Sequence, residues 1–298
     1  EGQSVYEIAD ALAKEGVIEN EFVFVVYALI TGNEKKLQAG RYIFQPGATM
    51  PVVVYSLAKG LAESDDIIIT IPEGFNVFDI DRRLAFFNLI TEGSFAVKYL
   101  GQEGWFFPDT YRIKKSEGSG ITSHELKMEE IKNKIIVNFD GKTKEIFKNI
   151  NVQRQKEVMV IASILEKEAK NKEDMRLTAG VIENRLARGM FLQIDATVAY
   201  GACLRQLESL KVSKFKYCDV SQVPIGAEIK VDGPYNTYTR IGLPPGPIAN
   251  PGITAIQAVL NPTKSDYLYY LSTRDGSRII FSKTAAEHAA NRKIHLSI

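Results

Sequence analysis

The chain has 298 residues, of which 45% are hydrophobic and 24% are charged, and its 37 Lys and Arg nearly balance its 36 Asp and Glu. This length and composition are typical of a folded protein of about two domains, and the charge balance argues against a nucleic-acid partner, which would need a basic surface. Only two cysteines occur, Cys203 and Cys218, so one disulfide can form, although the sequence leaves open whether they pair. The three histidines are isolated, so we expect no metal site and no cofactor.

The first hundred residues predict short helices and strands in alternation. Apolar residues at helical spacing follow Ser4, a candidate N-cap, and stop at Gly16. Further helices and strands are expected over about 21–31 (helix), 39–47 (strand), 52–59 (helix), 65–71 (strand) and 76–85 (helix). A Glu-Gly pair followed by a helix occurs at residue 1 and again at residue 73, which predicts a weakly repeated small β/α unit.

A domain boundary is expected near residues 95–105, where glycines, a proline and clustered aromatic residues interrupt this rhythm. We therefore divide the chain into domains 1–98 and 99–298. The second domain should begin with a lysine-rich amphipathic helix over about 123–148, followed by helices over about 152–170 and 173–188. A proline-rich wall over 235–252 should come next, and then a helix capped by Asn250. The domain should end with a hairpin across Asp275–Gly276 and a last helix after Ser282. The predicted fold class is α+β.

Two glutamates, Glu166 and Glu168, lie at the end of an apolar run that predicts a buried helix. At about 100° per residue, Glu168 falls on the same face as Ile161 and Leu165, whereas Glu166 points to the other side, beside Ser163. The two carboxylates therefore cannot flank one substrate bond from a single straight helix. Glu168 is the carboxylate that faces the packed side.

Glu168 has two readings. Aliphatic neighbours raise the pKa of a carboxyl group, which suits Glu168 to hold a proton near neutral pH and donate it to a substrate. Alternatively, Glu168 caps its helix and pairs with an arginine of the next helix, Arg185 or Arg188. Spacing alone leaves both readings open.

Four long segments carry a family resemblance. In chain order they read EGWFFPDTYR, ASILEKEA, NRLARGMFLQIDATVAYG and YNTYTRIGLPPGPIANPG, within about residues 101 to 262. Together they resemble the endolytic murein transglycosylase (YceG-like) family, and AGRYIF and IPEGFNVFDI resemble that family's LysM-like region. The resemblance implies a small N-terminal β/α LysM-like module followed by a mixed α+β catalytic domain.

The same resemblance implies an activity and its residues. The family cleaves the β-1,4 bond between N-acetylmuramic acid and N-acetylglucosamine in nascent peptidoglycan and leaves a 1,6-anhydro end. Its catalytic glutamate lies in the motif S-x-x-E-x-E, where the second glutamate is Glu168, and Glu166 and Ser163 are given supporting roles. Ordinary glycosidases need two carboxyl groups. Here one is enough, because the substrate's own 6-hydroxyl attacks: Glu168 protonates the glycosidic oxygen and then accepts the hydroxyl proton.

The cationic transition state still needs polar support from loops near Glu168. The candidates for support or substrate binding are Gln193, Asp195, Thr197, Tyr200, Asn236 and Tyr238. Structural alternatives stay open for several of them, since Asp195 can cap the following helix, Asn236 can form a turn, and a buried tyrosine is commoner than a platform for sugars.

Two other functions stay open. A lysozyme-type hydrolase would need a second carboxylate, for which Asp195 is the nearest candidate, and a glycan-binding scaffold of cell-wall synthesis would need no chemistry. The expected partners are peptidoglycan strands and peptidoglycan synthases. The family's anchor is one N-terminal transmembrane helix, which would lie before Glu1, with the catalytic domain outside the cytoplasmic membrane. No run in this chain approaches the ~20 apolar residues that span a bilayer.

Overall fold

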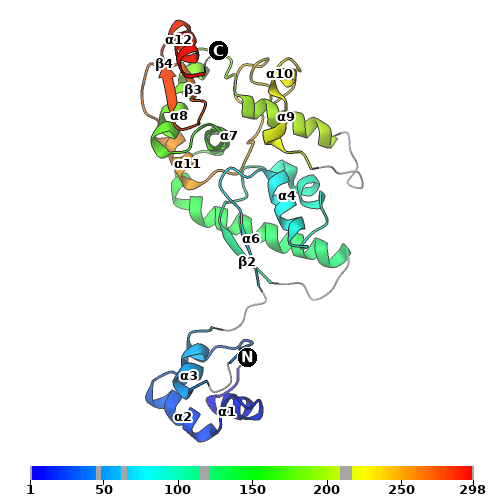
Figure 1. Cartoon of the computed structure of the whole chain (residues 1–298), viewed down its shortest axis with the longest axis vertical. Helices are drawn as coiled ribbons and strands as arrows, with labels where there is room; N and C mark the ends of the chain where they lie inside the picture. Colours follow the sequence, from blue (N-terminus) through cyan, green and yellow to red (C-terminus); the bar gives the residue numbers. More distant parts are fainter. Residues whose placement is uncertain (1, 45–47, 62–65, 115–120, 209–216, 297–298) are drawn as a thin grey trace. The chain divides into compact units, whose positions relative to one another are not determined.

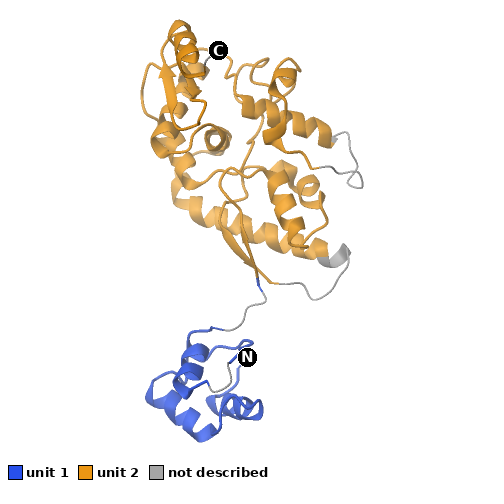
Figure 2. Cartoon of the chain, viewed as in Figure 1, with its two compact units in different colours: residues 1–66 blue, residues 67–298 orange. Residues whose placement is uncertain are grey.

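The computed structural model describes residues 2–44, 48–61, 66–114, 121–208 and 217–296. Within these ranges the chain is mostly helical, with two small two-stranded sheets, so the predicted α+β class holds in this broad form (Figure 1). The chain forms two compact units, Glu1–Asp66 and Ile67–Ile298 (Figure 2). The predicted boundary after residue 98 lies inside the second unit. None of the helices in the described ranges has the run of apolar residues that a membrane-spanning segment needs.

The first unit is built from helices. They are α1 (Val5–Lys14), α2 (Glu21–Ile30) and α3 (Met50–Ala58). The predicted start of α1 is confirmed, because the Ser4 hydroxyl accepts the Glu7 N–H while the Glu7 carboxylate accepts the Ser4 N–H. Phe24 and Val53 are fully buried in the small core between these helices.

The strand predicted over residues 39–47 does not form in the part of it that is described, residues 39–44. This stretch is irregular; the ring of Tyr42 stacks on Phe44, and the Tyr42 hydroxyl donates to the Gln38 carbonyl at 2.8 Å. A strand needs a partner for its main-chain groups, and the described residues of this unit include none. The β/α unit predicted here therefore does not form among the described residues of the first unit.

A small β/α unit does form at the start of the second compact unit. Its elements are β1 (Ile67–Thr70), α4 (Val77–Phe86), α5 (Ser94–Tyr99), a 3-10 turn (Leu100–Gln102) and β2 (Thr110–Ile113). The two strands pair antiparallel, with Ile67 opposite Ile113. The buried Asp81 carboxylate of α4 accepts the N–H groups of Gly93, Phe95 and Ala96, which fixes the start of α5 against α4.

The remaining elements of the second unit are mainly helices. They are α6 (Ile121–Phe147), α7 (Val152–Glu168), α8 (Lys172–Ala187), α9 (Asp195–Glu208), a 3-10 turn (Val220–Gln222), α10 (Ile225–Glu228), α11 (Ile253–Leu260), β3 (Tyr269–Ser272), β4 (Ile279–Ser282) and α12 (Ala285–Leu296). Every residue of α7 from Val158 to Leu165 is buried, because α8 and α11 pack against it (Figure 1). The predicted hairpin is confirmed, with β3 antiparallel to β4.

Asn250 does not cap α11 as its sequence suggested, because the N-cap of that helix is Gly252. Asn250 is instead fully buried and joins three segments of the chain. Its amide oxygen accepts the N–H groups of Gly104 and Phe106, both at 2.9 Å. Its amide nitrogen donates to the Phe75 carbonyl and to the Glu103 carboxyl group, at 2.9 and 2.6 Å.

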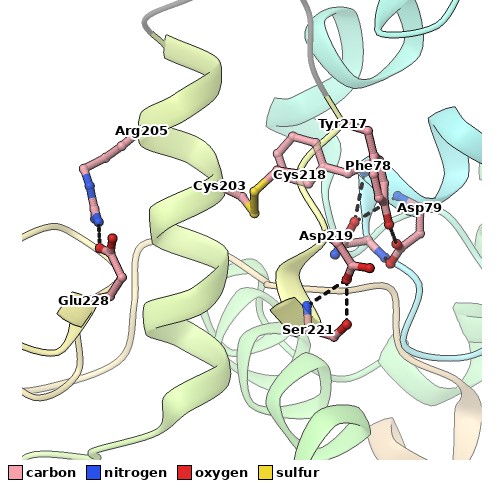
Figure 3. Close-up of a disulfide and its surroundings, with 10 residues drawn as sticks. Phe78, Asp79, Cys203, Arg205, Tyr217, Cys218, Asp219, Ser221 and Glu228 are labelled. Carbon is pink, nitrogen blue, oxygen red and sulfur yellow. Dashed lines mark hydrogen bonds and ion pairs between the residues drawn. A yellow bond between two sulfur atoms is a disulfide. The ribbon is translucent and has the colours of Figure 1, made fainter. Parts of the chain in front are cut away.

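Cys203 and Cys218 form a disulfide, which answers the question that the sequence left open. The bond ties α9 to the segment that begins at Tyr217 (Figure 3). The same segment is held from the other side, because the Tyr217 hydroxyl donates to Asp79 at 3.0 Å and Arg82 lies 4.5 Å from the centre of the Tyr217 ring.

Removing this disulfide is expected to lower the free energy of unfolding by about 3 kcal/mol, because it closes a loop of 15 residues and such closure restricts the unfolded chain. The measurement is urea unfolding of the protein with and without a reductant, beside the double variant Cys203→Ser, Cys218→Ser. The variant should match the reduced protein. An unchanged unfolding midpoint in both would contradict this expectation.

Candidate active site

Glu168 opens into a cavity of about 550 Å³. The walls come from the end of α7, from α8, from the loop before α9, from β3 and from α12. The polar residues that line it are Glu168, Arg185, Gln193, Asp195, Tyr238, Tyr269, Tyr270, Ser272, His288 and Arg292. Elements far apart in sequence thus place two carboxylates, three tyrosines and two arginines around one space.

Glu168 is the last residue of α7, which ends there because Ala169 has an extended backbone. The Tyr270 side chain, from β3, lines the same cavity. Burial raises the pKa of Glu168 to about 7, against an opposing decrease from the Tyr270 hydroxyl and with a further increase from the nearby Asp195 charge. The group therefore exchanges its proton near neutral pH.

The alternative interpretation was that Glu168 pairs with an arginine of the next helix. Arg185 of that helix bonds to the main chain instead. Its guanidinium donates to the main-chain carbonyls of Leu268, Phe191 and Leu192, at 2.6, 3.3 and 2.6 Å. Burial lowers the pKa of Arg185. Arg185 thus fixes the backbone around the cavity.

Glu166 faces a different cavity, of about 560 Å³, which agrees with the opposite orientation expected from the helical spacing. Its carboxylate accepts the Gly252 N–H at 2.9 Å. Burial raises the pKa of Glu166 to about 7, and the Glu73 charge adds to the increase. A Cβ atom at position 252 would lie 1.7 Å from a Glu73 carboxylate oxygen, so a larger residue there would require the Glu73 side chain to move.

Asp195 lines both cavities. It is the first residue of α9, and its carboxylate accepts the Tyr238 hydroxyl at 2.5 Å. Burial, together with the Asp195 contact, raises the pKa of Tyr238, which keeps its hydroxyl protonated. Asp195 therefore lies where the two cavities adjoin, and its carboxylate accepts a hydrogen bond from the neutral Tyr238 hydroxyl.

Gln193 has a left-handed backbone, with φ of 52°, and its side chain lines the Glu168 cavity. The backbone is held in place by Thr237, whose carbonyl accepts the Gln193 N–H at 3.0 Å and whose hydroxyl accepts the Ile194 N–H at 2.9 Å. A non-glycine residue in this conformation is uncommon and costs free energy.

Of the residues predicted from the sequence, the structure brings Glu168, Gln193, Asp195 and Tyr238 to one cavity. Four others make internal hydrogen bonds and line neither of the two cavities described above. The Ser163 hydroxyl donates to the Val160 carbonyl and accepts the Ile248 N–H, and the Thr197 hydroxyl bonds to the Ile194 carbonyl and the Thr237 hydroxyl. The Tyr200 hydroxyl donates to the Glu103 carboxyl group. The Asn236 amide bonds to the main chain at Ile229, Val231 and Tyr238. These bonds agree with the structural alternatives for Tyr200 and Asn236.

The sequence did not single out Tyr270 or Glu73. Tyr270 belongs to the run DYLYYLS, whose alternation predicts a strand but does not say which ring reaches the end of α7. Among the described residues, no cluster of His, Cys, Asp and Glu could hold a metal ion.

Comparison with known proteins adds the family context. The model of the YceG-like family matches residues 1–294. Two similar relatives are called endolytic murein transglycosylase. The one from Streptococcus pneumoniae R6 is 28% identical, and the match covers all of this chain and 57% of the relative. The one from Bacillus subtilis 168 is 29% identical, and the match covers 99% of this chain and 83% of the relative. A crystal structure of a putative YceG-like protein from Listeria monocytogenes is 28% identical and matches 97% of this chain and 96% of its own, with a TM-score of 0.55. The chain thus spans little more than half the length of the Streptococcus relative.

Proposed function

The chain belongs to the YceG-like family, and from this premise we propose that it is an endolytic lytic transglycosylase of peptidoglycan. It would cleave the β-1,4 bond between N-acetylmuramic acid and N-acetylglucosamine, with Glu168 as the catalytic residue. The observation that carries the proposal is that Glu168, whose pKa burial raises to about 7, opens into a cavity that Gln193, Asp195 and Tyr238 also line. Such a group can hold a proton before the reaction and accept one after it.

The proposed chemistry moves one proton out of Glu168 and one back. Protonated Glu168 donates to the glycosidic oxygen as its bond to C1 breaks. The carboxylate that remains accepts the proton of the muramyl 6-hydroxyl as that oxygen bonds to C1, so no water enters the product. Gln193, Asp195 and Tyr238 lie in the same cavity, where their polar atoms can support the cationic transition state.

The experiment that tests this function is digestion of purified, uncrosslinked glycan in ¹⁸O-labelled water, followed by mass spectrometry of the new muramyl ends. A transglycosylase leaves an unlabelled 1,6-anhydro end, one water lighter than a hydrolytic end. A second function, lysozyme-type hydrolysis, is favoured by one observation: Asp195 lines the same cavity as Glu168 and raises its pKa by charge repulsion. Label in most product ends would establish that function instead.

The rate constant kcat/KM is expected to fall as the pH rises through about 7. The sign follows from the direction of transfer, because Glu168 must be protonated to donate and loses its proton above its raised pKa. The measurement is glycan cleavage across the pH range in which the protein stays folded. Glu166 has a similar pKa, so Glu166→Gln is the control, and its profile should keep the alkaline fall. A fall that disappears in this control would assign the titration to Glu166.

The setting of the enzyme is part of the same proposal. We place its catalytic unit outside the cytoplasmic membrane, with peptidoglycan strands as substrate and peptidoglycan synthases as partners. The Cys203–Cys218 disulfide supports the location, because disulfides persist in oxidising compartments.

A LysM-like glycan-binding role for the front of the chain is supported by a cavity of about 550 Å³ in the first unit, which the stacked rings of Tyr42 and Phe44 help to line.

A further inference from the structure

The helix α12 contributes two side chains to the wall of the Glu168 cavity. His288 and Arg292 lie one turn apart on this helix, and both line the cavity. The His288 ring stacks on the Tyr269 ring of β3, with 5.3 Å between their centroids. The side chain of Arg292 thus brings a positive charge to the same cavity as the proposed catalytic carboxyl group.

Contacts with the hairpin and its end hold α12 in place (Figure 1). The Thr284 hydroxyl accepts the Glu287 N–H at 3.2 Å, which caps the start of the helix. The Asn291 amide donates to the Ser282 hydroxyl of β4 at 3.0 Å. The helix is therefore fixed on the hairpin at the residue next to Arg292.

Arg292 is exposed and makes no hydrogen bond or ion pair with any residue that the structure describes. The acidic groups of the cavity have other roles, since the Asp195 carboxylate accepts the Tyr238 hydroxyl at 2.5 Å and Glu168 holds the proton for the reaction. Arg185, which also lines the cavity, donates to main-chain carbonyls. Among the described residues, the charge of Arg292 thus has no counter-charge.

A cation without a counter-charge is unfavourable beside the proposed reaction. The transition state carries positive charge on the sugar, so a nearby guanidinium opposes it unless an anion neutralises the guanidinium. The sugar rings and their N-acetyl groups are neutral and cannot supply this anion. The peptide stems that muramic acid carries do have carboxylates, and a guanidinium binds a carboxylate through two parallel N–H groups.

We propose that Arg292 is a specificity-determining residue, which binds a carboxylate of the peptide stem on the muramic acid in the Glu168 cavity. This inference rests on the proposed function of Glu168. The stem leaves the sugar through the lactyl group, away from the bond that breaks, so its carboxylates can meet an exposed side chain of the cavity wall. Such a contact is made equally before and during the chemical step, so it strengthens substrate binding and leaves the rate of that step unchanged.

The test compares Arg292→Gln with the parent protein on uncrosslinked glycan that has intact peptide stems. Glutamine keeps a polar side chain and removes the charge. We expect KM to rise about 5-fold with kcat nearly unchanged, which is the upper end of what an exposed ion pair contributes. On the same glycan with its stem carboxylates converted to methyl esters, the two proteins should have the same raised KM. An unchanged KM of the variant on intact stems overturns the proposal.

A third substrate distinguishes the two kinds of carboxylate that muramic acid can present. Removal of the stems by an amidase leaves a bare lactyl carboxylate on each muramic acid. Arg292→Gln should leave the KM for this stripped glycan unchanged. A rise as large as that on intact stems would overturn the assignment to the stem.

The matched control is Lys293→Gln. Lys293 follows Arg292 on α12, is exposed and does not line the cavity. This variant also loses one positive charge from the helix, and its KM should match that of the parent protein on every substrate. Thermal unfolding of both variants checks that α12 is intact.

A second readout does not depend on cleavage. The variant Glu168→Gln should bind glycan with intact stems without cutting it, so calorimetry can measure its Kd, which should rise about 5-fold when Arg292→Gln is added. An equal Kd with and without the second substitution overturns the role of Arg292. Failure of the proposed function looks different, because Glu168→Gln would then cleave glycan as fast as the parent protein, whatever the change at Arg292 does.

Discussion

Glu168→Gln is expected to lower kcat by roughly 10² or more while the protein stays folded. Glutamine keeps the size of the side chain, but it has no acidic proton to transfer. Burial favours the neutral form of Glu168, and a neutral amide meets the same surroundings, so the unfolding midpoint should change little. The measurements are the release of glycan fragments and thermal unfolding.

Two variants of the same helix make the result specific. Glu157→Gln changes a partly exposed glutamate of α7 that pairs with Arg154 at 3.4 Å, and it should leave activity unchanged. Glu166→Gln keeps the acceptor for the Gly252 N–H and should have a milder effect than Glu168→Gln. If Glu166→Gln is the more damaging change, the acid was assigned to the wrong carboxyl group.

Asn250→Ala is expected to lower the free energy of unfolding by about 4 kcal/mol. The change leaves the buried N–H groups of Gly104 and Phe106 without their acceptor, and each such loss costs about 1–3 kcal/mol. It also removes a donor from the buried Glu103 carboxyl group, whose pKa burial already raises to about 7. Urea unfolding at constant pH measures the change.

Asn261→Ala is the matched control. Asn261 ends α11, is exposed, and donates only to the Gln257 carbonyl of its own helix, so its loss should change stability by about 0.5 kcal/mol or less. If the two variants are equally stable, the buried contacts of Asn250 do not hold the three segments together.

The sequence predicted the features that depend only on residues close together in the chain. The Ser4 cap, the hairpin and the amphipathic α6 follow from spacing and turn chemistry, and the opposite directions of Glu166 and Glu168 follow from helical geometry alone. The predicted strand over residues 39–47 shows the limit. β-Branched and aromatic residues favour a strand, but a strand forms only where another chain segment offers its main-chain groups.

The parts of the site that the sequence missed depend on long-range contacts. Asn250 precedes a proline and a glycine, a pattern that predicts a helix cap. Its side-chain amide is instead buried, where its oxygen accepts the N–H groups of Gly104 and Phe106. Tyr270 and Glu168 line one cavity although about a hundred residues separate them in the chain, and α8 holds the segment before β3 through Asn184 and Arg185. No spacing within the strand encodes this arrangement.

The backbone of Gln193 shows that stability alone does not explain this site. A non-glycine residue with φ of 52° costs about 1 kcal/mol or more, and glycine would adopt the same conformation without strain. The chain instead keeps an amide side chain on the wall of the Glu168 cavity. Replacing Gln193 by glycine would thus relieve the backbone strain and at the same time remove the amide from the cavity wall, so the most relaxed residue at this position is not the one that serves the cavity.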